Sequence, residues 1–243
     1  SVNKLCKKLM KVDHNSKRLA GSKVLITGAT SGLGFSISIA LAQEGAEVIA
    51  VGRDKNRLED LSDAIEQTKG SVTLVCIDLA KQGTIEELSN RISENFGELH
   101  GIIHCAMSSL QMMPINQVSL KEVEINLLSP IMISFRLISC FHRLLSRDPK
   151  GLFVYISDVR TKKFNGPYNS AKKACDQLFL SYQEENKRLG INVLIQYPGP
   201  MGTKLRKKIF PGEKSSDADA INKEARRIIE KILMLTKSER IIT

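Results

Sequence analysis

Short apolar stretches rich in β-branched residues alternate along this chain with longer stretches of helical periodicity. The six strand-like stretches are Lys23–Thr27, Glu47–Val51, Val72–Ile77, Gly101–His104, Leu152–Ile156 and Ile191–Gln196. The five helix-like stretches are Gly34–Glu44, Lys55–Thr68, Thr84–Asn95, Leu120–Ser146 and Tyr168–Arg188. The alternation predicts a single three-layer α/β domain, in which a doubly wound parallel sheet of six or seven strands carries helices on both faces. Ligands of such sheets bind at the carboxyl ends of the strands, so we expect the functional residues in the turns that follow them.

Composition excludes several classes of protein. The chain has 243 residues, 42% of them hydrophobic and 26% charged, which is typical of one globular domain rather than a disordered or fibrous chain. No apolar run approaches the roughly 18 residues that span a bilayer, so no transmembrane segment is expected. The five cysteines are widely spaced and form no C-x-x-C pair, which predicts neither a disulfide framework nor a metal site. A reducing, cytoplasmic location is favoured, with an organellar matrix as the alternative.

The net charge of +10 is concentrated at the two ends of the chain. Apolar residues at helical spacing, among them Val2, Leu5 and Leu9, alternate with lysines and make residues 1–22 a basic amphipathic extension to a domain of residues 23–243. The extension either docks on the domain, contacts an anionic membrane surface weakly, or is an organellar presequence. Because the centre of the chain is nearly neutral and aromatic residues make up 5%, no specific nucleic-acid site is expected.

A glycine-rich turn follows the first predicted strand. It reads Thr27-Gly28-Ala29-Thr30-Ser31-Gly32-Leu33-Gly34 and opens the first helix. Glycines at these places allow a tight turn and let backbone N–H groups approach a pyrophosphate at the helix N-terminus. The turn therefore predicts a nucleotide site formed by Gly28, Thr30, Ser31, Gly32, Leu33 and Gly34.

In the spacing of this turn, T-G-x-x-x-G-x-G, the chain resembles the short-chain dehydrogenase/reductase family, and the resemblance extends over nearly all of it from Lys23 onwards. The other matching residues are Asp78-Leu79, Asn126, the Y-x-x-x-K motif Tyr168 to Lys172, and Pro198-Gly199 with Thr203. The resemblance implies a Rossmann-type domain, a nicotinamide cofactor, and hydride transfer between that cofactor and a small carbonyl or alcohol substrate. It also implies a homodimer or homotetramer formed through the two longest helices.

Tyr168 and Lys172 lie four residues apart, which places them on one face of a helix. An ammonium group near a phenol favours the ionised phenol, so Tyr168 is suited to act as a general acid near neutral pH. The resemblance adds that Lys172 bonds the nicotinamide ribose, that Asn126 maintains a proton relay, and that Asp78 and Leu79 contact the adenine.

The end of the second predicted strand bears on the choice of cofactor. Gly52 stands where an acidic residue would accept from the ribose hydroxyls, and Arg53 follows it. A guanidinium can bind a 2′-phosphate in bidentate fashion, so NADP(H) is favoured over NAD(H). Asp54, the next residue, is acidic and would repel a 2′-phosphate, which favours NAD(H) instead.

Two turns depart from the family pattern. His104-Cys105-Ala106-Met107 stands where the family has N-A-G, with Cys105 and Ala106 as the expected cofactor contacts and Met107 as a bulky neighbour. Asp158 falls at the usual position of the catalytic serine unless the segment slides by one residue and presents Ser157. Ser157 would donate a hydrogen bond to the substrate oxygen, whereas an ionised Asp158 would repel it. The alternative function is therefore a catalytically impaired NADP(H)-binding scaffold or regulatory protein.

Residues 200–216 are expected, by the resemblance, to form a lid over the nicotinamide. Lys204, Arg206, Lys207 and Lys208 within it, together with the basic run from Arg160 to Lys163, suggest an anionic substrate, although both runs also suit solvated loops.

Overall fold

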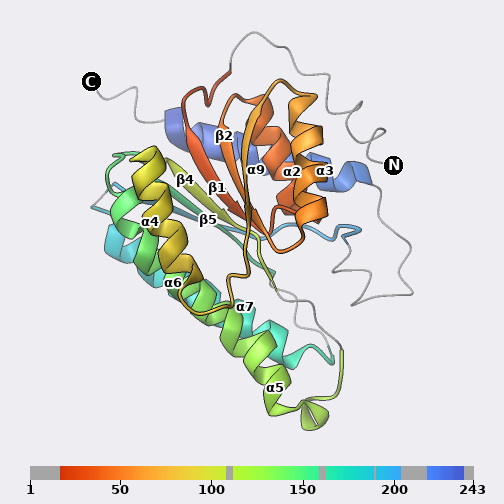
Figure 1. The fold of residues 1–243 in the computed structure, drawn as a ribbon. Helices are drawn as coiled ribbons and strands as arrows, with labels where there is room; N and C mark the ends of the chain where they lie inside the picture. Colours follow the sequence, from red (N-terminus) through yellow and green to blue (C-terminus); the bar gives the residue numbers. More distant parts are fainter. Residues whose placement is uncertain (1–16, 108–111, 159–162, 189, 204–217, 238–243) are drawn as a thin grey trace.

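The computed structural model describes residues 17–107, 112–158, 163–188, 190–203 and 218–237 (Figure 1). The six strands within these residues are β1 (Lys23–Thr27), β2 (Glu47–Gly52), β3 (Ser71–Cys76), β4 (Gly101–His104), β5 (Leu152–Ile156) and β6 (Asn192–Gln196). They form one sheet in the order β3-β2-β1-β4-β5-β6, with each neighbouring pair parallel. The winding reverses between β1 and β4, which confirms the predicted doubly wound sheet.

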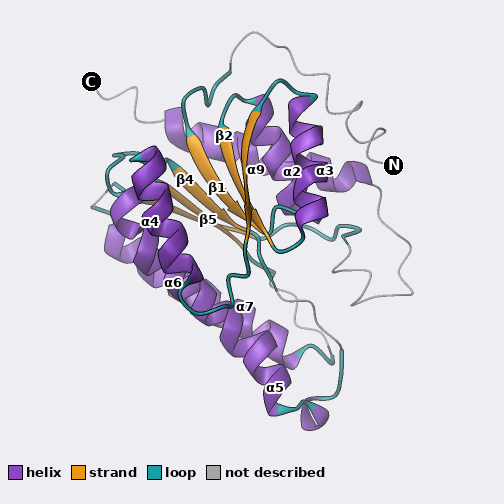
Figure 2. Cartoon of the chain, viewed as in Figure 1, coloured by secondary structure: helices purple, strands orange, loops and turns teal. Residues whose placement is uncertain are grey.

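Helices cover both faces of this sheet (Figure 2). They are α2 (Gly32–Gln43), α3 (Lys55–Glu66), α4 (Thr84–Phe96), α5 (Leu120–Val123), α6 (Ser129–Leu145), α7 (Gly166–Asn186) and α9 (Ala218–Lys237). Apolar side chains of α2, α3 and α9 pack on one face of the sheet, and those of α4, α6 and α7 pack on the other. Both cores are built on strands whose side chains are buried on both faces, as a parallel sheet between helix layers requires.

Two features of the helices differ from the prediction. The stretch expected as one helix from Leu120 to Ser146 is interrupted by a π-helical turn, η2 (Glu124–Leu128), between α5 and α6. Helix α9 was not predicted, because the basic charge of the last forty residues obscured its apolar face. Ala225, Ile228 and Ile232 recur at helical spacing on that face and are buried in the core beside α2.

The stretch Leu120–Leu145 is long and apolar enough, by length and composition, to cross a membrane. The sequence analysis expected no apolar run long enough to span a bilayer and did not identify this stretch. A single stretch of this kind is weak evidence for a membrane span, because helices that pack on the sheet of a folded domain meet the same criterion. Here Leu137 and Phe141 of this stretch are fully buried in the core shared with α4 and α7.

The end of the predicted basic extension packs on the domain. Arg18 forms ion pairs with Glu44 after α2, at 2.6 Å, and with Glu230 of α9, at 2.9 Å. The buried side chain of Leu19 joins the core beneath these pairs. Residues 17–22 are thus held against the domain, and residues 1–16 lie outside the described part of the chain.

Candidate active site

The carboxyl ends of the central strands lie level with one another, so their turns gather at one edge of the sheet. Thr27 at the end of β1 pairs in register with Val51 of β2 and His104 of β4, and Ile156 of β5 pairs with Gln196 of β6. The turns after these residues open a cleft of about 1190 Å³. It is lined by these predicted site residues: Gly28, Thr30, Ser31, Gly32, Leu33, Gly34, Arg53, Asp78, Leu79, Cys105, Ala106, Ser157, Tyr168, Lys172, Pro198, Gly199 and Thr203. Asn126, the remaining predicted residue, is buried nearby without lining the cleft.

The glycine turn between β1 and α2 has the geometry that a bound pyrophosphate needs. Gly28 has φ +72° and Gly32 has φ +55°, both in the left-handed region that favours glycine. A Cβ on Gly28 would lie 2.8 Å from backbone atoms of Ala106. The first turn of α2 holds no acidic residue, and Ser31 makes no side-chain cap to it. Its N–H groups and the positive end of the helix dipole therefore suit a phosphate group.

A basic patch lies at the β2 end of the cleft. Arg53 is exposed and lines the cleft together with Arg57 of α3. Asp54, which argued against a 2′-phosphate, caps α3 by accepting from the Arg57 backbone N–H at 3.2 Å and pairs with the Arg57 guanidinium at 3.1 Å. Its carboxylate is thus engaged by the helix that it starts. Asp78, after β3, lines the same end and accepts from the backbone N–H of Ala80.

Tyr168 and Lys172 meet in the middle of the cleft. Both belong to α7, both are 5% exposed, and the Lys172 Nζ lies 6.0 Å from the centre of the Tyr168 ring. Lys172 donates to the Ile156 carbonyl oxygen at 2.7 Å, which fixes its ammonium at the end of β5. Burial lowers the pKa of Lys172, and the nearby negative groups, Asp158 among them, offset part of that effect. The side chains of Tyr168 and Lys172 thus lie close together on one face of α7, as their four-residue spacing predicts.

Asp158, rather than Ser157, lies beside the Tyr168 hydroxyl. The Tyr168 Oη donates to the Asp158 Oδ2 over a long distance of 3.5 Å. Ser157 is 2% exposed, and its hydroxyl lies near Asp176 of α7. Burial raises the pKa of Asp176, and the Ser157 hydroxyl offsets part of that effect. The residue next to the phenol is therefore an acceptor, whereas the sequence left open whether Asp158 or the neutral donor Ser157 takes that position.

Asn126 lies at the π-helical turn η2, between α5 and α6. It is 7% exposed, and its Oδ1 has no hydrogen-bond partner among the described residues. Buried polar atoms of this kind are places where ordered water binds. Its surroundings are therefore compatible with the water relay that the resemblance implies.

His104 forms a buried polar network under the cleft. Its Nδ1 lies 2.7 Å from the Thr27 Oγ1, and its Nε2 lies 3.2 Å from the Ser134 Oγ of α6. The Thr27 hydroxyl also accepts from the Ala106 N–H, so the network ties β1, β4 and α6 together. Burial lowers the pKa of His104 to about 3, which keeps the imidazole neutral.

His104→Asn is expected to flatten the acid side of the stability curve. The ordinary pKa of a histidine is 6.5 and the pKa of His104 in the folded protein is about 3, so between these values the unfolded chain binds the additional proton. The free energy of unfolding should therefore fall with falling pH by about 1.4 kcal/mol per unit from this group alone. Urea unfolding of both proteins from pH 7.5 to 4 measures it. A stability difference between them that stays constant with pH would contradict the buried neutral imidazole.

Several residues that line the cleft were not predicted. Arg57 follows Arg53 at one helical turn's distance, Glu124 lies two residues before Asn126, and Asn165 stands three residues before Tyr168. In the sequence, the only indication that these residues lie at the site is their short separation from residues that were predicted. Met107 also lines the cleft, beside Ala106. Residues 159–162 and 204–217, which hold most of both basic runs and most of the predicted lid, lie outside the described residues.

The described cysteines, Cys76, Cys105, Cys140 and Cys175, are free thiols. Burial raises the pKa of Cys105 to about 12, so this thiol at the cleft stays protonated. In the described part of the chain, no three His, Cys, Asp or Glu side chains are grouped so that they could hold a metal ion.

The fold of this chain is shared with known proteins. A family model described as short chain dehydrogenase matches residues 22–214. An uncharacterized oxidoreductase of Staphylococcus epidermidis is 23% identical over 193 residues, which are 78% of this chain and 82% of the relative. A short-chain dehydrogenase of Shigella flexneri solved with NADP superposes with a TM-score of 0.81 at 23% identity, over 91% of this chain and 93% of that one. Another of Escherichia coli, solved with NADPH, gives a TM-score of 0.80 at 23% identity, over 90% and 92%.

Proposed function

The chain belongs to the short-chain dehydrogenase family, a family of oxidoreductases, and on that premise we propose that it transfers a hydride between NADP(H) and a small carbonyl or alcohol substrate. One observation carries the proposal. The glycine turn at the start of α2 and the Tyr168–Lys172 pair of α7 line the same cleft, so an extended nucleotide bound at the turn would reach the phenol. When bound, the reduced nicotinamide supplies the hydride.

The proposed roles of the catalytic residues follow from their positions. Tyr168 gives its phenolic proton to the substrate oxygen as the carbonyl is reduced. Lys172, held by the Ile156 carbonyl, favours the phenolate that remains and binds the nicotinamide ribose. Asn126 holds the water through which the proton is replaced. Ser157 can orient the carbonyl only if its hydroxyl turns from Asp176 toward the cleft.

The proposed cofactor contacts divide along the cleft. The turn from Gly28 to Gly34 would hold the pyrophosphate, and Asp78 with Leu79 the adenine. Cys105, Ala106, Pro198, Gly199 and Thr203 would border the nucleotide farther along. NADP(H) is proposed over NAD(H) because Arg53 and Arg57 lie at the expected place of the 2′-phosphate. The complexes of similar proteins with NADP and NADPH support the same choice.

Arg53→Ala should weaken the binding of NADPH by about 10- to 100-fold, as expected for the loss of charged hydrogen bonds to a phosphate. The affinity for NADH should change by less than about threefold, since NADH has no 2′-phosphate. Isothermal titration with both nucleotides measures the two effects. Lys55→Ala is the matched control, because Lys55 is a neighbouring cation of α3 with 78% of its side chain exposed, outside the cleft. An equal loss for both nucleotides would exclude Arg53 as the phosphate-binding residue.

The second candidate function is an NADP(H)-binding scaffold or regulator that lacks catalytic activity. Asp158 favours it, because an acceptor beside Tyr168 opposes the negative charge that develops on a carbonyl oxygen. A scaffold would bind NADPH and would not oxidise it with any carbonyl compound. The proposed oxidoreductase would do both.

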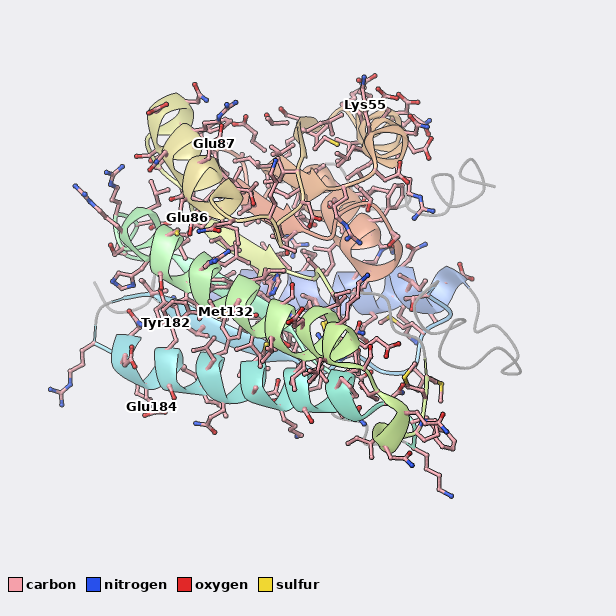
Figure 3. All side chains as sticks on the ribbon, turned by 60° about the horizontal axis from the view of Figure 1, so that its bottom comes forward. Lys55, Glu86, Glu87, Met132, Tyr182 and Glu184 are labelled. Atoms are coloured by element: carbon pink, nitrogen blue, oxygen red, sulfur yellow. The ribbon has the colours of Figure 1, made fainter. Side chains whose placement is uncertain are left out.

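We also propose a homodimer or homotetramer formed through α6 and α7, which lie side by side (Figure 3). Leu128, Met132, Phe135 and Leu180 expose between 42% and 50% of their surface on this part of the molecule. Exposed apolar side chains grouped on neighbouring helices are typical of subunit interfaces. Such an assembly would cover part of the apolar stretch from Leu120 to Leu145.

We also propose a domain organisation and a cellular location for the chain. Residues 23–243 would form the catalytic domain, with a lid at about residues 200–216 and the extension of residues 1–22 packed on its surface. The proposed location is cytoplasmic, with an organellar matrix as the alternative. The proposed partners include no specific nucleic acid and no lipid beyond a weak contact of the extension with a membrane surface.

A further inference from the structure

Asp176 is a third buried polar side chain on the face of α7 that carries Tyr168 and Lys172. It follows Lys172 by four residues, as Lys172 follows Tyr168, so the three side chains lie on the same side of the helix. Each of the three residues is 5% exposed. Tyr168, Lys172 and Ser157 line the cleft, and the Asp176 carboxyl lies behind Ser157. This carboxyl is therefore separated from the cleft by one side chain.

Polar groups from the ends of β5 and β6 and from α7 act on the Asp176 carboxyl. They are the hydroxyls of Ser157, after β5, and Tyr197, after β6, and the ammonium groups of Lys172 and Lys173 on α7 itself. The Lys172 ammonium donates to the carbonyl at the end of β5, and Lys173 is exposed to solvent. The two hydroxyls are therefore the groups best suited to bond to this carboxyl.

Ser157 is the better placed of these two hydroxyls. It is 2% exposed, whereas Tyr197 is 42% exposed and can bond to water. Among the described residues, neither the Ser157 Oγ nor the carboxyl oxygens of Asp176 have a hydrogen-bond partner of ordinary geometry. Buried polar atoms without partners are costly, so these two neighbouring side chains are expected to pair.

The charge on Asp176 determines which way the Ser157 proton points in such a pair. A carboxylate only accepts, so Ser157 donates to it and the serine O–H turns away from the cleft. A protonated carboxyl can donate to the Ser157 Oγ, which leaves the serine proton for an acceptor in the cleft. Burial raises the pKa of Asp176, although the hydroxyls and the two lysines offset part of that effect. Burial also raises the pKa of the neighbouring Tyr155, so that phenol stays neutral and adds no charge.

We propose that Asp176 is a positioning residue that acts through Ser157. In its ionised form Asp176 holds the Ser157 hydroxyl away from the cleft, and in its protonated form it frees that hydroxyl to donate to the substrate oxygen. The inference rests on the proposed function and adds to it a control by pH. Tyr168 remains the proton donor, since the Asp176 proton stays on the carboxyl and the Ser157 proton stays on the serine. Carbonyl reduction is then faster when Asp176 is neutral, because the developing oxyanion gains a donor.

Asp176→Asn should raise kcat/KM at pH 8 by at least about 10-fold, because the amide can donate to the Ser157 Oγ as the protonated acid does. The assay follows the oxidation of excess NADPH with the fastest of butanone, cyclohexanone and benzaldehyde. The advantage of the variant should shrink as the pH falls from 8 to 5, since the unmodified protein takes up the proton on Asp176 in that direction. A ratio of the two kcat/KM values that stays constant with pH would overturn the proposal.

Asp176→Leu is a second test, because a leucine of similar size removes the acceptor without offering a donor. It should show a rise in kcat/KM in the same direction. Introduced into Ser157→Ala, Asp176→Asn should change kcat/KM by less than about twofold, since the hydroxyl through which it acts is missing. Glu184→Gln is the matched control, because it removes an exposed carboxylate of α7 outside the cleft, and it should leave kcat/KM unchanged (Figure 3). A rise that persists without the Ser157 hydroxyl would contradict an action through Ser157.

A measurement without substrate separates this inference from the proposed function. The pKa of Asp176 can be followed by NMR of its carboxyl carbon, and it should lie above the ordinary value of 3.8. Ser157→Ala should raise it further by about one unit, because a hydroxyl that stabilises the ionised form is lost. An unchanged pKa in Ser157→Ala would overturn the inference alone. A protein that shows this coupling and binds NADPH but reduces no carbonyl compound would overturn the proposed function instead.

Discussion

Tyr168→Phe is expected to lower kcat for carbonyl reduction by about 100- to 10,000-fold, the usual contribution of a general acid. The substitution removes the phenolic oxygen, which is the one atom of Tyr168 that can protonate the substrate. The ring would still fill its buried position on α7, where Tyr168 is 5% exposed. The affinity for NADPH should therefore change by less than about threefold. Initial rates of NADPH oxidation with the fastest ketone substrate, together with a nucleotide titration, measure both quantities.

Tyr182→Phe is the matched control for this variant. Tyr182 lies on the same helix, is also 5% exposed, and bonds through its hydroxyl to His142 at 3.0 Å, away from the cleft. The loss of this hydroxyl in Tyr182→Phe should lower the free energy of unfolding by about 1 kcal/mol and leave kcat unchanged. If Tyr168→Phe retained more than a tenth of the unmodified rate, Tyr168 would not be the proton donor.

Gly28→Ala is expected to impair both stability and nucleotide binding. The new Cβ would lie 2.8 Å from the backbone of Ala106, across the β1–β4 edge, and the residue would keep φ near +72°. Left-handed backbone strain costs about 1–2 kcal/mol, and overpacking adds about 1–3 kcal/mol. Because the turn itself holds the proposed pyrophosphate site, NADPH affinity should fall by at least about 10-fold.

Gly97→Ala separates the two causes. Gly97, at the end of α4, has nearly the same backbone angle, with φ +71°, and no atom lies within 4 Å of the position of its Cβ. This variant should suffer only the backbone strain, which urea unfolding should show as a loss of about 1–2 kcal/mol in the free energy of unfolding. Its affinity for NADPH should be unchanged. Equal effects of the two substitutions on nucleotide binding would show that the close approach of Gly28 to Ala106 does not shape the site.

The sheet and most of the cleft follow from local patterns in the sequence. Buried parallel strands need continuous apolar runs, so their positions could be predicted to within one or two residues. The pair Tyr168 and Lys172 is four residues apart on a helix, and that spacing alone determines that both side chains share a face. The same holds for the glycine turn, where the backbone angles of Gly28 and Gly32 exclude most other residues.

Other features depended on contacts between distant segments. Whether Ser157 or Asp158 meets Tyr168 depends on the path of the chain between β5 and α7, which no local pattern determines. Cys105 stands where the family resemblance led us to expect an amide. The imidazole of His104 before it is explained only by its neighbours Thr27 and Ser134, which come from β1 and α6.

Titration of the unmodified protein with NADPH and NADH, followed by nicotinamide fluorescence, shows whether this cleft binds NADP(H). Saturable NADPH binding is expected, with a dissociation constant in the micromolar range, at least about 10-fold tighter than that for NADH. The absence of a saturable change with either nucleotide at millimolar concentration would exclude the cleft as an NADP(H) site.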